Sequence, residues 1–170
     1  MTVLLLIRNE SPYKRLYRTP ELKKLAERVC SGENAPGNAE ISLLFCGDAF
    51  ITELNNKYRN KNAPTDVLAF AQPAELAASA RRSKAFWPLG DVVISLETVA
   101  RRCTGPEEER LRRAAMRQEV RLLFCHGLLH LLGSDHASER NRASMNAKQA
   151  RYLGITEEAA WHFSHKRGNV

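Results

Sequence analysis

The sequence is poor in cysteine, and its four cysteines include no pair in the CxxC spacing. Cys30, Cys46, Cys103 and Cys125 are far apart, and each lies in a segment apolar enough to be the interior of a helix or strand. Small secreted proteins that depend on disulfides are dense in cysteine instead. The pattern therefore indicates a reduced chain and favours a cytoplasmic location.

Long hydrophobic runs are also lacking. The first apolar run, VLLLI at residues 3–7, has no basic region before it and no cleavage site of small residues after it. No later run approaches the roughly 20 apolar residues that a membrane-spanning helix needs. We therefore expect neither a signal peptide nor a membrane partner, and we interpret residues 3–7 as a β-strand.

Acidic residues are outnumbered, because 19 aspartates and glutamates stand against 26 lysines and arginines, giving a formal net charge of +7. With 44% hydrophobic residues, the composition is typical of a folded basic protein. A chain of 170 residues can form one domain, residues 1–170, whose core does not need a metal for its stability. The charge favours polyanionic partners such as nucleic acid.

The hydrophobic pattern predicts a few short strands early in the chain. We expect strands at residues 3–7, 41–46, 66–70 and 91–95. The segment 71–88 is rich in alanine and basic residues, so it is expected to be a surface excursion between two adjacent strands.

Helices dominate the second half of the sequence. They are expected at residues 19–32, 48–60, 97–103, 107–132, 138–152 and 156–163. Together these elements predict an α+β fold in which a small mixed four-stranded sheet is packed with about five helices.

Three of the five histidines lie in the segment HGLLHLLGSDH, residues 126–136. On a helix, His126 and His130 are offset by about 40° around the axis and roughly 6 Å along it, so both can reach one ion. Gly133 ends the helix, and the following turn can bring His136 back to the same point. Three neutral imidazoles leave a tetrahedral Zn²⁺ one open position. The segment therefore predicts a metal site at the C-terminal end of the long helix.

The residue that follows the first of these histidines argues against a zinc protease of the HExxH type. A zinc protease of the HExxH type has a glutamate general base directly after its first histidine, and here that position is Gly127. Ser134 and Asp135 are candidates to orient an imidazole from outside the metal site, although they also suit a plain turn.

A second pair, His162 and His165, has no third ligand nearby in the sequence. We therefore do not expect a metal there.

Three segments resemble the YbeY family of bacterial metal-dependent endoribonucleases. HGLLHLLGSDH is similar to that family's H-G-x-x-H-L-x-G-x-D-H signature. LNNKYRNKNAPTDVLAF, residues 54–70, and LGDVVIS, residues 89–95, resemble two further family motifs in the expected order. The resemblance extends over about residues 40–153.

The resemblance implies a function and a set of site residues. His126, His130 and His136 would hold one metal ion, with zinc as the default and another divalent transition metal possible. Arg59 would be the family's catalytic-site arginine. The implied activity is single-strand-specific endoribonuclease cleavage, acting in 16S rRNA 3′-end maturation and late ribosome quality control. The implied partners are ribosomal RNA of the small subunit, ribosomal proteins and assembly GTPases.

The sequence departs from the family pattern at three positions. Asn62, Ala69 and Ser134 stand where an aspartate, a serine and an aromatic residue are usual. None of these departures removes a proposed metal ligand. Arg59 can contact two phosphate oxygens at once through its guanidinium, which agrees with a role in phosphodiester chemistry.

Two basic clusters are candidates for contact with RNA. Arg81, Arg82 and Lys84 form one, and the seven arginines within residues 101–121 form the other. Two further readings stay open: a ribosome-associated assembly factor with a mainly structural metal, and a metallohydrolase of another bond.

Overall fold

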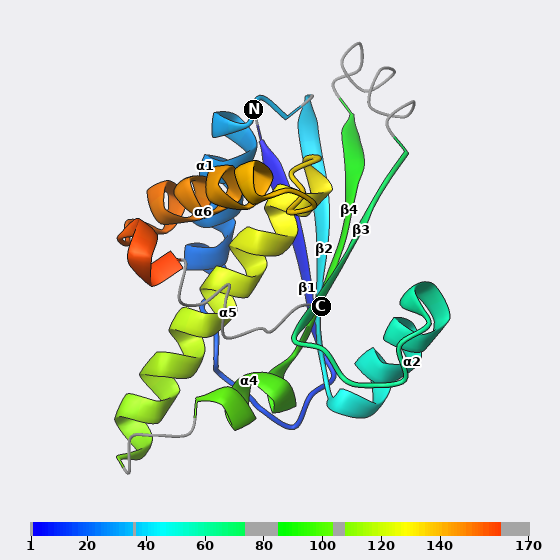
Figure 1. Ribbon diagram of the computed structural model, residues 1–170, viewed down its shortest axis with the longest axis vertical. Helices are drawn as coiled ribbons and strands as arrows, with labels where there is room; N and C mark the ends of the chain where they lie inside the picture. Colours follow the sequence, from blue (N-terminus) through cyan, green and yellow to red (C-terminus); the bar gives the residue numbers. More distant parts are fainter. Residues whose placement is uncertain (1, 36, 74–84, 104–107, 161–170) are drawn as a thin grey trace.

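The computed structural model describes residues 2–35, 37–73, 85–103 and 108–160 (Figure 1). This part of the chain contains four strands and five longer helices, and a further helical turn at residues 157–160 begins where the helix at 156–163 is expected. The strands are β1 (Val3–Asn9), β2 (Asn38–Cys46), β3 (Val67–Ala71) and β4 (Phe86–Ser95). The helices are α1 (Thr19–Gly32), α2 (Asp48–Arg59), α4 (Leu96–Arg102), α5 (Glu109–Leu131) and α6 (Glu139–Leu153). The predicted α+β class and four-stranded sheet are confirmed.

The strands form one mixed sheet in the order β1-β2-β4-β3. β1, β2 and β4 are parallel, and β3 is an edge strand antiparallel to β4. The strand expected at 91–95 begins earlier, at Phe86. Pro88 and Gly90 concealed this extension, because both are rare in strand interiors. Gly90 has a φ of +146°, and a Cβ there would lie 2.2 Å from the backbone oxygen of Phe70.

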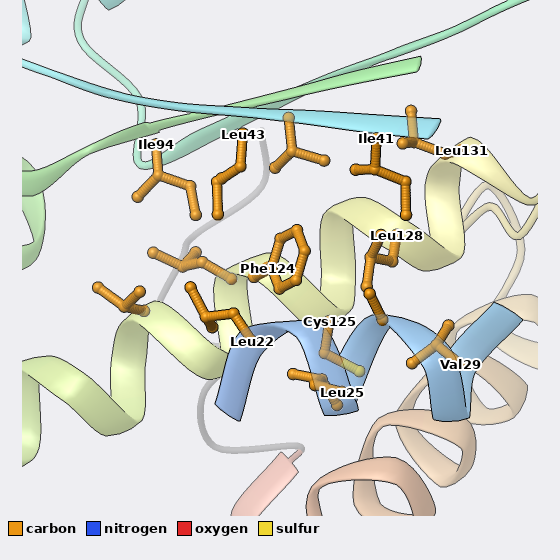
Figure 2. Close-up of a cluster of buried hydrophobic side chains, with 14 of the residues drawn as sticks. Leu22, Leu25, Val29, Ile41, Leu43, Ile94, Phe124, Cys125, Leu128 and Leu131 are labelled. Atoms are coloured by element: carbon orange, nitrogen blue, oxygen red, sulfur yellow. The ribbon is translucent and has the colours of Figure 1, made fainter. Parts of the chain in front are cut away.

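The helices cover the two faces of the sheet unequally. α1 and α5 pack against one face with α6 beside them, and α2 lies on the opposite face (Figure 1). Figure 2 shows the main core between the sheet, α1 and α5. Its labelled members are Leu22, Leu25, Val29, Ile41, Leu43, Ile94, Phe124, Cys125, Leu128 and Leu131. None of the described helices combines the length and apolarity needed to cross a bilayer.

The C-terminal half of α5 is enclosed by the rest of the fold. Every residue from Leu122 to Leu129 is buried, because the sheet, α1 and α6 surround this part of the helix. Gly127 faces β4, where an added Cβ would lie 2.8 Å from Val92 Cγ1. The absence of a side chain at position 127 thus lets the helix approach the sheet closely.

Asp48 fixes the start of α2 on the other side of the molecule. Its carboxylate accepts hydrogen bonds from Ser95 Oγ (2.5 Å) and Thr98 Oγ1 (2.7 Å), and it pairs with Arg101 (2.6 Å). Burial alone would raise the pKa of Asp48, but these three donors lower it below its ordinary value. Because Ser95 and Thr98 belong to β4 and α4, the network fixes α2 relative to the sheet.

The close approach of α5 to β4 can be tested by adding a methyl group. Gly127→Ala improves helix propensity by about 1 kcal/mol but overpacks the Val92 contact, which costs about 1–3 kcal/mol. We expect the balance to lower the free energy of unfolding of Gly127→Ala by up to about 2 kcal/mol in the native background. In a Val92→Ala background, where the clashing methyl groups are gone, the same substitution should be neutral or stabilising.

Urea unfolding of the two single variants and the double variant measures this coupling. An equal effect of Gly127→Ala in both backgrounds would show that Val92 does not limit the space at position 127.

Candidate metal centre

α5 ends in a Schellman motif, a turn closed by two backbone hydrogen bonds. Ser134 N donates to Leu129 O (2.9 Å), and Gly133 N donates to His130 O (3.0 Å). Gly133 has a φ of +86°, which glycine adopts without strain. The turn reverses the chain, so that His136 returns toward the end of the helix.

The three histidines singled out in the sequence lie together at this turn. Their candidate ligand atoms are all within 4.8 Å of one another. His126 Nε2 and His130 Nε2 are 3.1 Å apart, and the ring centroid of His136 is 4.9 Å from that of His130. His126 is only 9% exposed, whereas His136 is exposed. The cluster therefore opens to solvent on the His136 side.

This arrangement fits a tetrahedral divalent ion. Zinc–nitrogen distances of about 2.0–2.1 Å separate two ligands of a tetrahedron by about 3.3 Å, close to the 3.1 Å between His126 and His130. The three candidate metal ligands found among the described residues are all imidazoles. Imidazole nitrogens suit zinc and neighbouring transition metals. Three protein ligands leave one tetrahedral position for water or substrate.

The surroundings of His130 favour its neutral form. Burial, followed by the nearby His136, lowers the pKa of His130 from 6.5 to about 4. A backbone hydrogen bond with Ser134 and the charge of Asp135 act in the opposite direction, but they do not outweigh burial. The ring is therefore uncharged at pH 7, as a metal ligand has to be.

α6 supplies a contact to the histidines that the sequence analysis missed. Gln149, which is 0% exposed, places Oε1 2.9 Å from His126 Nδ1. In the sequence, Gln149 lies between Met145 and Tyr152 on the apolar face of α6, and both of these neighbours are buried. A polar residue in such a stripe is the signal that could have identified it, because a buried amide needs hydrogen-bond partners.

A second contact from α6 reaches the turn itself. Lys148 Nζ lies 2.7 Å from Glu33 Oε2 and 3.3 Å from Ser134 Oγ. Tyr152 donates a hydrogen bond to the same Glu33 carboxylate at 2.8 Å. Glu33 follows the end of α1, so this network ties α1, α6 and the histidine turn together. The Ser134 hydroxyl thus faces Lys148.

Asp135 takes part in the turn between α5 and α6. Its Oδ1 accepts hydrogen bonds from Asn141 Nδ2 (2.6 Å) and from Ala137 N (3.0 Å). The hydrogen bond from Asn141 is the main reason that the pKa of Asp135 lies below its ordinary value. In this structure the Asp135 carboxylate therefore orders the turn that carries His136.

Arg59 approaches the histidines from another element. It is the last residue of α2, which ends at Asn60 in the left-handed conformation (φ +56°). After burial and His136, the positive charge of Arg59 also lowers the pKa of His130, so Arg59 is within electrostatic reach of the cluster. Within the described part of the chain, Arg59 makes no ion pair or hydrogen bond and is exposed to solvent.

The two basic clusters predicted to contact RNA are not found next to the histidines in the described part of the chain. Arg81, Arg82 and Lys84 lie outside the described residues, as do His162 and His165. The first arginine of α5, Arg110, lies at the far end of that helix from the histidines (Figure 1), about 30 Å from His130 along the axis.

Several arginines of the segment 101–121 are paired within the protein. Arg101 pairs with Asp48, Arg102 pairs with Asp66, and both Arg112 and Arg113 pair with Glu109. The positive charge of this segment is thus partly neutralised, and it does not surround the histidine cluster.

Comparisons with known proteins identify the family of this sequence. A family model described as Endoribonuclease YbeY matches residues 7–157. A protein named Endoribonuclease YbeY from Pelotomaculum thermopropionicum is 42% identical over 134 residues, covering 78% of this chain and 82% of that protein. Its namesake from Roseiflexus sp. (strain RS-1) is 34% identical over 151 residues, covering 86% and 91%.

The fold is also similar to that of a protein of known structure. The solution structure of TM1509 from Thermotoga maritima aligns with a TM-score of 0.55 and 22% sequence identity, covering 97% of this chain and 94% of that chain. Because the family model spans most of the sequence and relatives above 30% identity cover more than two thirds of it, the chain belongs to the endoribonuclease YbeY family.

Proposed function

We propose that this protein is a metal-dependent endoribonuclease that cleaves single-stranded RNA. The observation that carries the proposal is the convergence of His126, His130 and His136 beside the charge of Arg59. Relatives that share most of the sequence bear the name Endoribonuclease YbeY. We assign His126, His130 and His136 as ligands of one ion per chain, with zinc as the default metal.

Phosphodiester cleavage requires stabilisation of the negative charge that develops on the phosphate. When bound, a divalent ion supplies Lewis-acid polarisation to a phosphate oxygen. Arg59 supplies a second positive charge, and its planar guanidinium can donate two hydrogen bonds to phosphate oxygens. The exposed side of the histidine cluster, at His136, is where an RNA backbone can approach both groups.

A peptidase function is disfavoured by the position of Gly127. In a zinc protease of the HExxH type, this position carries the glutamate general base. Here it faces Val92 in the core rather than the histidine cluster. A glutamate at position 127 would meet the sheet, so the helix has no place for that base.

The same proposal includes a substrate, protein partners and a location in the cell. We infer that the substrate is ribosomal RNA of the small subunit, processed during 16S rRNA 3′-end maturation and late ribosome quality control. Ribosomal proteins and assembly GTPases are the proposed partners, and the cytoplasm is the proposed location. The net charge of +7 agrees with a polyanionic substrate.

Metal content tests the ligand assignment. We expect gently purified protein to contain about one zinc-class ion per chain, and His130→Ala to lose most of it, because two imidazoles bind such an ion much more weakly than three. Elemental analysis of the folded proteins is the measurement. A double variant, His162→Ala with His165→Ala, serves as the matched control and should keep its metal. Unchanged metal in His130→Ala would refute the site.

RNA cleavage by Arg59 variants separates an enzyme from an assembly factor. If Arg59 stabilises charge that develops during cleavage, Arg59→Ala should keep its fold and metal and reduce the rate by about a hundredfold or more. Arg59→Lys should recover little of this loss, because an ammonium cannot make the two-point contact. Single-turnover cleavage of one labelled single-stranded RNA is measured with the bound fraction in parallel.

Lys57→Ala is the matched control for loss of positive charge, since Lys57 is exposed on the same helix. It should weaken RNA binding slightly and leave the rate at saturation unchanged. Equal rates for wild type and Arg59→Ala at matched occupancy would remove Arg59 from the chemistry. Loss of binding in strict proportion to activity would favour the assembly-factor reading.

A further inference from the structure

Gln149 is fully buried beneath the histidine cluster, and its amide has two directional contacts. Oε1 lies 2.9 Å from His126 Nδ1, and Nε2 donates to Asn146 Oδ1 at 3.3 Å. With the Asn146 oxygen turned toward it, the NH2 end of the Gln149 amide faces Asn146 and the oxygen end faces the imidazole. If the amide were turned over, its carbonyl oxygen would face the Asn146 oxygen instead.

An amide oxygen can only accept a hydrogen bond, so this contact selects one form of the imidazole. A neutral imidazole carries a proton on one nitrogen and a lone pair on the other. With Oε1 beside it, His126 Nδ1 has to carry the proton. The lone pair is then on Nε2, the atom that lies 3.1 Å from His130 Nε2 on the side where the three histidines meet.

We propose that Gln149 is a positioning residue for the metal centre, holding His126 in the Nδ1–H tautomer with its Nε2 lone pair directed at the ion. The inference deepens the proposed function and rests on the metal site assigned above. Without this acceptor, the His126 ring would distribute between two tautomers and could rotate. Part of the population would then present an N–H group to the ion.

The contact also links the site to α6. Lys148, the residue before Gln149 on α6, places its Nζ 3.3 Å from Ser134 Oγ in the histidine turn. α6 thus contacts both parts of the metal site, the buried end of α5 through Gln149 and the turn through Lys148. The contact of Gln149 with His126 is the one that sets the tautomer of His126.

Two variants of similar size separate hydrogen-bond acceptance from packing. Gln149→Met fills the same space without an acceptor, whereas Gln149→Glu keeps an acceptor at the same distance along the side chain. We expect Gln149→Met to weaken Zn²⁺ binding by about 10–100-fold, the range typical for loss of a group that orients a metal ligand. Gln149→Glu should bind Zn²⁺ at least as tightly as wild type, because a charged acceptor strengthens the hydrogen bond.

Competition between each folded protein and a zinc chelator gives the affinities. Met145→Leu is the matched control, because Met145 is buried in the same helix one turn away, and it should leave the affinity unchanged. A purely structural role for Gln149 predicts the reverse order, with Gln149→Met close to wild type and the buried carboxylate of Gln149→Glu the more damaging change. That order would overturn the proposal.

A measurement on the wild-type protein does not depend on any variant folding. Nitrogen-15 chemical shifts of the imidazole rings in metal-free protein at about pH 8, where an ordinary imidazole is neutral, report which ring nitrogen carries the proton. We expect the proton of His126 on Nδ1, and a proton on Nε2 would overturn the proposal even if zinc binds. Failure of wild type to bind Zn²⁺ would instead refute the metal centre, whatever the tautomer of His126.

Discussion

The close contact between α5 and β4 is the constraint on which the histidine cluster depends. Gly127 lies against Val92 with no room for a Cβ, and the flanking residues Leu122 to Leu129 are buried. This packing fixes the rotation of α5 about its own axis. Because His126 and His130 are one turn apart on that helix, their direction is set by the same packing. The Schellman turn at Gly133 then returns His136 to them.

Arg59, the proposed partner of the three histidines, belongs to α2 on the opposite face of the sheet. Asp48 binds Ser95, Thr98 and Arg101, and so fixes the start of α2. Both α2 and α5 contact β3, which is the edge strand next to β4. Two helices on opposite faces of a sheet can approach each other only around its edge, and the charge of Arg59, the last residue of α2, acts on His130 of α5. The sheet thus lies between the two helices, and the proposed role of Arg59 requires their C-terminal ends to approach each other around its β3 edge.

Local patterns in the sequence predicted the strands, the helices and the spacing of the three histidines, because these depend on residues a few positions apart. The longer β4 was missed because Pro88 and Gly90 interrupt its pattern. Gln149 was missed because its partner, His126, is remote in sequence and belongs to another helix. The proximity of Arg59 to His130 followed from family resemblance and not from spacing. Contact of RNA with the arginines of residues 101–121 stays a prediction, but Asp48 and Asp66 from other parts of the fold pair with two of them, and Glu109 pairs with two more on the same helix.

The dependence of RNA cleavage on the histidine centre is measured most directly by returning zinc to metal-free protein in sub-stoichiometric steps. Single-turnover cleavage of a labelled single-stranded RNA is recorded at each step, together with circular dichroism to follow the fold. We predict that the cleavage rate rises linearly with added zinc and levels off at about one ion per chain, while the fold does not change. Full cleavage by the metal-free protein would contradict the account.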